Sequence, residues 1–337
     1  MSVVGVDARG GERWYDAKGK FHRVDGPALK WADGSKFWYL HGKLHRVDGP
    51  AEEWADGTKK WHFEGKLHRV DGPAEELADG SNFWYLHGKR HRVDGPAVER
   101  NDGLKKWYFE GNLHRVDGPA VEYANGSKEW YLRGERHRVD GPAIDWVDVT
   151  YGTKDWYLYG KLHRVDGPAV EHPDGTKKWY FKGKLHRVDG PAKECPDGSK
   201  WWYLYGKFHR VDGPAKEWAD GSKFWHHHNE LHRVNGPAVE WADGSKWWYL
   251  HNKLHRVGGP AVEWADGSKE WYFEGHEITE AQSEFIRRMH KKTFHHKFKL
   301  LRYWMIEQMH DPQKKPGEKR AAESWDDTRE LYAKRNK

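Results

Sequence analysis

Polar and apolar residues alternate in short runs, and this pattern recurs at a constant interval along most of the chain. In each repeat an Asp-Gly-Ser or Asp-Gly-Thr step, as at residues 33–35 and 56–58, separates two β-prone runs. This is a strong hairpin signal because Gly accepts the positive φ that such turns require. Further turns fall at residues 25–27 and 41–43. Each repeat therefore predicts a β-hairpin unit of its own.

The segment His-Arg-Val-Asp-Gly-Pro-Ala, or a close variant, marks eleven such repeats. Its histidine falls at His22, His45, His68, His91, His114, His137, His163, His186, His209, His232 and His255, and the one longer step, from His137 to His163, holds an insertion near residues 148–151. A lone hairpin is marginally stable in water, so each repeat needs neighbours. We predict an all-β fold, an elongated antiparallel β-hairpin solenoid or ribbon with a rise of roughly 9.6 Å per repeat.

The alternation also predicts which side chains form the core. In the strand after the Asp-Gly turn, one face carries a Trp and, two residues later, a Leu or Phe, except in the repeat that has His227. The other parity mixes Phe37, Lys60 and Glu129, which disfavours burial. Tyr39 and its equivalents are expected on the wetter face. The predicted structural core is Trp38, Trp61, Trp84, Trp107, Trp130, Trp156, Trp179, Trp202, Trp225, Trp248 and Trp271.

Segments such as HGKLHRVDGPAEEWADGTKKW, residues 41–61, resemble MORN repeats. They share the 23-residue period, the Gly-Lys-x-His step, the Asp-Gly turn and the aromatic strand. The Gly that usually follows the His is replaced by Arg-Val-Asp-Gly-Pro-Ala, which is similar to the MORN-like repeats of large DNA viruses and phages. The resemblance covers roughly residues 12–275. It implies a membrane-tethering, assembly or partner-binding module, and a virus-encoded host-interaction or virion protein fits it.

Charge is distributed unevenly along the 337 residues. The net charge is +6, and the residues from Glu280 onward hold 15 Lys and Arg against 9 Asp and Glu, so the repeats are neutral and the C-terminal segment is basic. Nucleic-acid binding is therefore disfavoured. A single cysteine, Cys195, fits a reducing compartment, and neither a signal peptide nor an 18-residue apolar run is evident. We expect a soluble, cytoplasmic protein.

The periodic pattern ends after Gly275, which suggests three segments: the repeats at 1–275, a basic amphipathic helix at 276–312 and a charged flexible tail at 313–337. Thr279 and Gln282 match a capping box. Ala281, Phe285 and Met289 begin the predicted apolar face. We expect this helix either to cap the last hairpin or to contact a partner or an anionic membrane through basic residues. These are Arg287, Arg288, Lys291, Lys292, Lys297, Lys299 and Arg302.

Metal binding is disfavoured by the repeat geometry. Equivalent histidines of adjacent repeats would lie about 9.6 Å apart, whereas two ligands of one zinc ion lie at most about 4.2 Å apart. His226, His227 and His228 form a local exception. Alternation places His226 and His228 on one strand face without an evident third ligand, and a drifted repeat is the favoured interpretation. No metal site and no cofactor are predicted.

Catalysis is disfavoured because the same His and Asp recur in nearly every repeat, whereas enzymes usually build one special site. No catalytic residue is predicted. We expect the Asp to accept turn N–H groups, and the His and Arg to bond an adjacent loop or an acidic neighbour. Asn235 and Gly258 replace this Asp in the last two repeats, which suggests a looser array there.

Binding along the outer face is the remaining hypothesis. A two-residue turn would place Glu53 opposite Lys60 and Glu99 opposite Lys106, so the acidic row either serves binding or forms cross-strand salt bridges. The leading functional prediction is a non-catalytic scaffold for a protein partner. The alternative is a peripheral membrane module that uses the basic helix.

Overall fold

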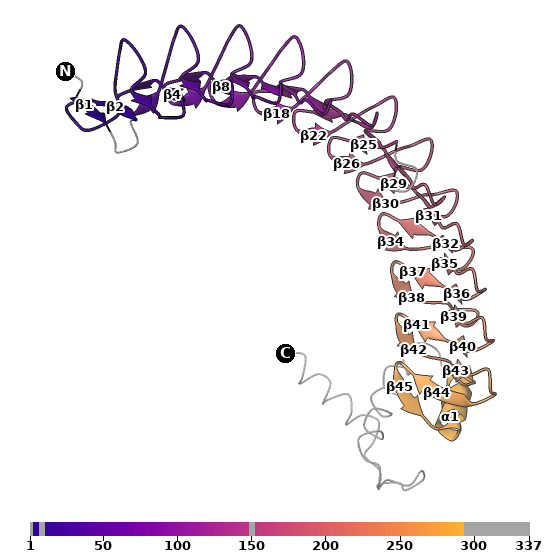
Figure 1. Ribbon diagram of the computed structural model, residues 1–337. Helices are drawn as coiled ribbons and strands as arrows, with labels where there is room; N and C mark the ends of the chain where they lie inside the picture. The colour runs from indigo at the N-terminus through magenta and orange to yellow at the C-terminus, as the bar shows by residue number, and fades with distance from the viewer. Residues whose placement is uncertain (1–2, 7–10, 148–151, 293–337) are drawn as a thin grey trace, which may run out of the picture. The chain divides into compact units, whose positions relative to one another are not determined.

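The computed structural model describes residues 3–6, 11–147 and 152–292 (Figure 1). It consists of short antiparallel strands and one helix, so the predicted β-hairpin repeat with a C-terminal helix is confirmed. The chain divides into two compact parts, Met1–Asp243 and Gly244–Lys337. Of the predicted segments, residues 148–151 and 293–337 lie outside the described residues.

Every complete repeat holds two hairpins. The first, here called the sheet hairpin, joins a strand after Pro-Ala to a strand after the Asp-Gly turn. In the first part these strands are β3 (Leu29–Lys30), β4 (Lys36–Phe37), β7 (Glu52–Glu53), β8 (Lys59–Lys60), β11 (Glu75–Glu76), β12 (Asn82–Phe83), β15 (Val98–Glu99), β16 (Lys105–Lys106), β19 (Val121–Glu122), β20 (Lys128–Glu129), β23 (Ile144–Asp145), β24 (Lys154–Asp155), β27 (Val170–Glu171), β28 (Lys177–Lys178), β31 (Lys193–Glu194), β32 (Lys200–Trp201), β35 (Lys216–Glu217), β36 (Lys223–Phe224) and β39 (Val239–Glu240).

The second hairpin, the side hairpin, follows the Trp of each repeat. Its paired strands are β5 (Tyr39–Leu40) and β6 (Lys43–Leu44), β9 (His62–Phe63) and β10 (Lys66–Leu67), β13 (Tyr85–Leu86) and β14 (Lys89–Arg90), β17 (Tyr108–Phe109) and β18 (Asn112–Leu113), β21 (Tyr131–Leu132) and β22 (Glu135–Arg136), β25 (Tyr157–Leu158) and β26 (Lys161–Leu162), β29 (Tyr180–Phe181) and β30 (Lys184–Leu185), β33 (Tyr203–Leu204) and β34 (Lys207–Phe208), and β37 (His226–His227) and β38 (Glu230–Leu231).

The sheet hairpins join into a continuous antiparallel ladder within the first part. The second strand of each repeat pairs with the first strand of the next, as β4 does with β7, with Phe37 opposite Glu52. At the N-terminal end β1 (Val3–Val6) pairs with β2 (Glu12–Tyr15), which pairs with β3. Figure 1 shows these repeats following one another in chain order. Each repeat is therefore hydrogen-bonded to its chain neighbours, as in other repeat proteins.

The Asp-Gly turn has one residue more than the sequence prediction assumed. Gly57 donates to the Trp54 carbonyl at 3.0 Å with φ at 95°, and Thr58 donates its N–H to Asp56. This is the pattern of a three-residue loop that ends in a left-handed glycine. The register therefore shifts by one, and Glu53 faces Lys59. The predicted pairing of Glu53 with Lys60 is wrong, and so is that of Glu99 with Lys106, since Glu99 faces Lys105.

The predicted inward face of the strand is also wrong. Phe37 and Glu129 are only 5% and 4% exposed, and His62 is buried at the position of Tyr39. At the position of Leu40, by contrast, Phe63 and Phe109 are more than 40% exposed. The Trp side chains predicted to form the core are partly buried in the described repeats. The smallest apolar side chain fills the tightest position instead, because the Ala of each Pro-Ala step is completely buried.

In two repeats the charged residue on this face has polar partners. Glu129 accepts from the Tyr123 and Tyr131 hydroxyls at 2.9 and 2.6 Å. Lys60 lies 2.7 Å from Glu75 across neighbouring repeats. The charged residues at this position therefore reflect partners in the same repeat, as for Glu129, or in the next one, as for Lys60, and they do not show that the face is exposed.

The partly buried Trp is covered by the Arg of its own repeat. The Arg46 guanidinium lies 4.1 Å from the Trp38 ring centre, and Arg46 also bonds Asp48, the Pro50 carbonyl and Glu53 at 3.0 to 3.2 Å. The predicted bond to an acidic neighbour is thus present. The Asp accepts from this Arg side chain, although the sequence had suggested turn N–H groups as its donors.

The second part holds the last repeat strands and the helix. These are β40 (Lys246–Trp247), β41 (Tyr249–Leu250), β42 (Lys253–Leu254), β43 (Val262–Glu263), β44 (Lys269–Phe273), β45 (His276–Ile278) and α1 (Glu280–Lys292). Thr279 and Gln282 exchange hydrogen bonds at 2.8 and 3.3 Å, so the predicted capping box is confirmed. Residues 276–278, predicted to be helical, instead form a strand that pairs with β44.

The buried face of α1 differs from the prediction. Ile286 is 1% exposed and packs with Phe273 and Ile278, whereas Ala281 is exposed and Phe285 is 43% exposed. The apolar positions chosen from the sequence left out Ile286, which is the α1 residue in this cluster of buried apolar side chains. Among the described residues, no helix combines the length and the apolar character needed to cross a membrane.

Candidate functional site

A valine recurs in the loop that follows the His-Arg pair of every repeat. In the first part this residue is 77% to 91% exposed. We call these residues the valine row: Val24, Val47, Val70, Val93, Val116, Val139, Val165, Val188, Val211 and Val234. Single exposed apolar residues are ordinary, but the same one at the same place in ten repeats forms a periodic apolar surface.

The backbone beneath this row is rigidly built. Next to Val70, Arg69 donates to Asp71, to the Pro73 carbonyl and to Glu76. A Cβ on Gly72 would lie 2.8 Å from the Arg69 Cζ, so a larger residue there would displace the guanidinium from its present position. The loop is therefore held by its own arginine, and Val70 remains exposed on its surface.

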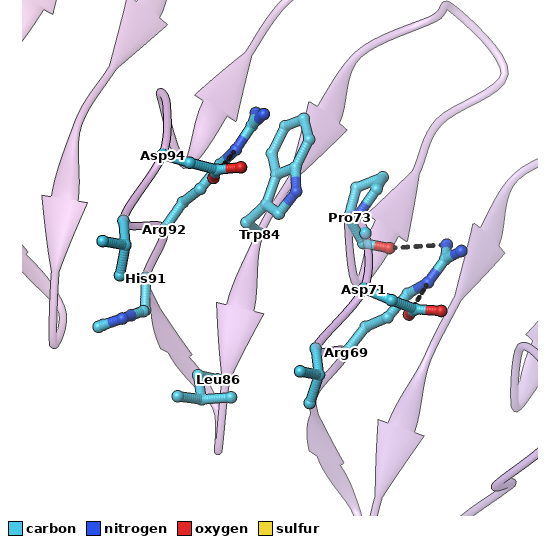
Figure 2. A pocket seen from close by; sticks show the side chains of 11 residues that line it. Arg69, Asp71, Pro73, Trp84, Leu86, His91, Arg92 and Asp94 are labelled. Atoms are coloured by element: carbon cyan, nitrogen blue, oxygen red, sulfur yellow. Dashed lines mark hydrogen bonds and ion pairs between the residues drawn. The ribbon is translucent and has the colours of Figure 1, made fainter.

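Two successive loops enclose a groove. Between the loops that contain Val70 and Val93 its volume is about 640 Å³. Figure 2 shows the Trp84 side chain standing between the Arg92 and Arg69 loops. Trp84, Leu86 and the two valines give the groove an apolar part of its lining, and the arginines and aspartates of both loops line the rest.

Carboxylates flank the row. The Asp71 and Asp94 side chains are about 85% and 84% exposed, and each accepts from its arginine through one oxygen. The hydrogen bond from that arginine, with a smaller contribution from its charge, lowers the pKa of each carboxyl below its usual value. Both aspartates are therefore ionised at neutral pH, and a basic group can approach them from solvent.

The equivalent valine in the second part is covered. Val257 packs against the cluster of Ile286, Phe273 and Ile278, so α1 lies over the last of these loops. Gly258 replaces the usual Asp, and a Cβ there would lie 2.5 Å from the Arg287 Cδ. The sequence-based explanation of Gly258 was a loosened array; in the structure the glycine leaves space for the Arg287 side chain of α1.

The basic residues predicted to contact a partner or lipid lie in and beyond this helix. Arg287 and Arg288 both pair with Glu284, at 2.6 and 3.3 Å. Lys291 and Lys292 are the last two residues of α1. Lys297, Lys299 and Arg302 lie outside the described residues.

The repeated histidine links adjacent repeats. His68 Nδ1 accepts the backbone N–H of His87 at 3.0 Å, and the equivalent bond joins His45 to Glu64 and His186 to Tyr205. The acceptor is the imidazole of one repeat, and the donor lies in the two-residue turn of the next side hairpin, where φ is near 50°. The predicted bond to an adjacent loop is thus present.

Within the part of the chain that the structure describes, three histidines come together at one place. His209, His227 and His228 each offer a ligand atom within 4.8 Å of the others. His228 lies in the turn, with φ at 51°, and so does not follow strand alternation. The predicted pairing of His226 with His228 is wrong, because His226 is buried and stacks on Phe208. A second group of three is Asp16, His22 and His41.

Comparison of the sequence with known protein families gave no match, and comparison with curated proteins gave none either. The MORN resemblance therefore stays a prediction.

Proposed function

We propose that this protein is a non-catalytic binding scaffold whose valine row and interloop grooves receive a protein partner. The main support is a contrast between repeats. Ten valines of the row are at least 77% exposed, whereas Val257 is packed against Ile286 of α1. A MORN-like family membership would agree with this role.

The helix α1 indicates the chemistry of the partner. It places the aliphatic Ile286 on Val257 and the basic Arg287 beside the loop. In the first part the aspartates of the loops stay exposed beside the valines. A partner segment with aliphatic side chains next to Lys or Arg would complement both features.

The test places a photo-crosslinking amino acid at Val116, in the row, or at Lys128, an exposed sheet residue outside it. In native cells we expect Val116 to label a specific partner and Lys128 to label little. Equal labelling from both positions would contradict a docking role for the row.

The affinity of that partner is then measured with two matched triple variants of Val93, Val116 and Val139. Substitution by Thr keeps the β-branched shape but removes apolar surface, and should weaken binding by about 10-fold or more. Substitution by Ile keeps both properties and should leave affinity near that of the natural protein. Equal affinity of the two variants would argue against the row, and flotation of both on anionic vesicles would favour the membrane alternative.

A further inference from the structure

His227 interrupts an otherwise apolar position. The second residue after each Trp is Leu or Phe in the other ten repeats and His only here. In another repeat, Phe63 at this position lies between the ring of His45 at 4.8 Å and that of His68 at 5.9 Å. A histidine at this position therefore enters a space that already has an imidazole on either side.

The side hairpins supply those imidazoles. His227 lies 5.1 Å from His209 of the preceding repeat and 5.9 Å from His232 of its own, measured between ring centres. His228 lies 4.5 Å from His209 and 4.4 Å from His227. The rings of His209, His227 and His228 thus meet mutually at one point of the surface.

One hydrogen bond of His209 has to give way to a metal ion. His209 Nδ1 accepts the backbone N–H of His228 at 3.4 Å, so the neutral ring carries its proton on Nε2, and coordination through either ring nitrogen replaces this long hydrogen bond.

We propose that His209, His227 and His228 bind a divalent transition-metal ion, Zn²⁺ in the first instance. Imidazole suits zinc, copper and nickel, whereas magnesium and calcium prefer oxygen ligands. Zinc-bound nitrogens lie about 2.0 to 2.1 Å from the metal, so the present spacing of up to 4.8 Å closes with small rotations of the exposed His227 and His228. Water or a further side chain completes the tetrahedron.

The ion would tie two adjacent repeats together. His209 follows β34, and His227 with His228 belongs to the next side hairpin, β37 and β38. This role is independent of the proposed scaffold function, because it concerns the cohesion of neighbouring repeats. Either proposal can fail without the other.

The second three-residue group does not carry the same inference. Asp16 Oδ1 accepts the backbone N–H groups of Lys18 and Lys20, and its Oδ2 lies 3.3 Å from His41 Nδ1. Its carboxylate therefore already holds a turn.

The test titrates the full chain with Zn²⁺ in competition with a chromogenic chelator. His227→Leu restores the residue of most repeats at this position, so it removes a ligand without a foreign side chain. We expect the natural chain to hold one Zn²⁺ at this site and His227→Leu to bind it at least about 100-fold more weakly, since even loss of an outer-shell partner costs about 10–100-fold.

The control is His87→Lys. His87 and His68 form a two-histidine pair with ring centres 4.4 Å apart, and Lys182 occupies the same turn position elsewhere. This variant should bind zinc like the natural chain. Co²⁺ should give the visible absorption of a tetrahedral site in the natural chain and in His87→Lys, but not in His227→Leu. Zinc affinity in His227→Leu equal to that of the natural chain would overturn the proposal.

Discussion

Alanine occupies the most confined position of the repeat. Ala51 is fully buried, and its carbonyl accepts the Trp38 N–H of the preceding repeat at 2.8 Å. Ser35, also fully buried, accepts the Ala55 N–H at 3.0 Å. Small side chains therefore set the spacing between repeats, because larger ones would separate backbones that must stay within hydrogen-bonding distance.

A larger residue at this position should weaken the contact between repeats. We expect Ala51→Leu to destabilise the array by about 1 to 3 kcal/mol through overpacking. Ala55→Leu, at an exposed position of the same repeat, should stay within about 0.5 kcal/mol of the natural protein. Amide hydrogen exchange of Trp38 measures both effects, and equal protection in the two variants would contradict this account.

The sequence predicted the repeat and its turns but assigned the wrong side chains to the core. Large aromatic residues are the usual candidates for burial. Trp38, however, stacks under Arg46, while Phe37 and the paired Glu129 point inward. An ion pair between neighbouring repeats at Lys60, and hydroxyl bonds within one repeat at Glu129, stabilise charged side chains there, and alternation within one strand does not reveal these contacts.

The side hairpin is the element through which acid should act on the protein. Its turn donates an N–H to the Nδ1 of the preceding histidine, a bond that requires an unprotonated nitrogen. The same turn also donates from Gly88 to the Leu67 carbonyl, which does not titrate in this range. Neighbouring amides of one turn thus respond differently to pH.

As the pH falls, the hydrogen bonds to histidine Nδ1 should weaken before the other backbone hydrogen bonds of the turn. Burial lowers the pKa of His68 and of His186, and at His68 the charge of His87 adds to this effect. Both pKa values therefore lie below the unfolded value of about 6.5. Their contribution to stability is full above that pH and declines as pH falls through about 6.5 toward the folded pKa.

The measurement is amide exchange, corrected for its intrinsic pH dependence, between pH 8 and pH 5. The amides of His87 and Tyr205 should lose protection over this range, while Gly88 should lose less. A parallel loss at His87 and Gly88 would mean that the turn opens as a whole for another reason.

For the helix α1, the sequence predicted the start of the element but not its buried face. The capping box predicted its start correctly, because both bonds are local. Its buried face depends on Val257 and Phe273, which belong to the preceding repeat segments. Helical spacing alone could not distinguish Ile286 from Phe285.

Truncation of the buried helix residue should release α1 from the last hairpin. We expect Ile286→Ala to cost about 2 to 4 kcal/mol of local stability, because the side chain is 1% exposed. Phe285→Ala, at a position 43% exposed, should cost less although it removes more atoms. Exchange protection of the α1 amides gives the comparison, and a larger effect at Phe285 would restore the face predicted from the sequence.

At the scale of the whole chain, the distribution of contacts matters more than any one residue. Within Met1–Asp243, hydrogen bonds between repeats run from each repeat to the next along the chain. The histidine cluster follows the same rule, since His209 meets His227 and His228 one repeat later. The sequence did not predict this cluster because alternation ignores the turn at His228. A signal was present in the sequence. His228 follows His209 by the same number of residues as His87 follows His68, and the rings of His68 and His87 also lie close together.

Nearest-neighbour contacts imply that one complete repeat can be removed. Deletion of residues 118–140 takes out one full period together with Tyr123, Glu129, Tyr131 and Arg136, which bond one another. Lys106 would then face Ile144 in place of Val121, another aliphatic residue. Because all four bonded residues are removed together, the deletion leaves none of them without its partner.

We expect this deletion to fold, with the denaturant dependence of unfolding reduced in proportion to the shorter chain. Deletion of residues 118–129 removes one sheet hairpin but leaves its side hairpin, so Trp107 loses the Ala120 carbonyl as its acceptor without an equivalent replacement. That half-repeat deletion should be the more damaging one. If it were tolerated better than removal of the full period, the complete repeat would not be the unit that stabilises the array.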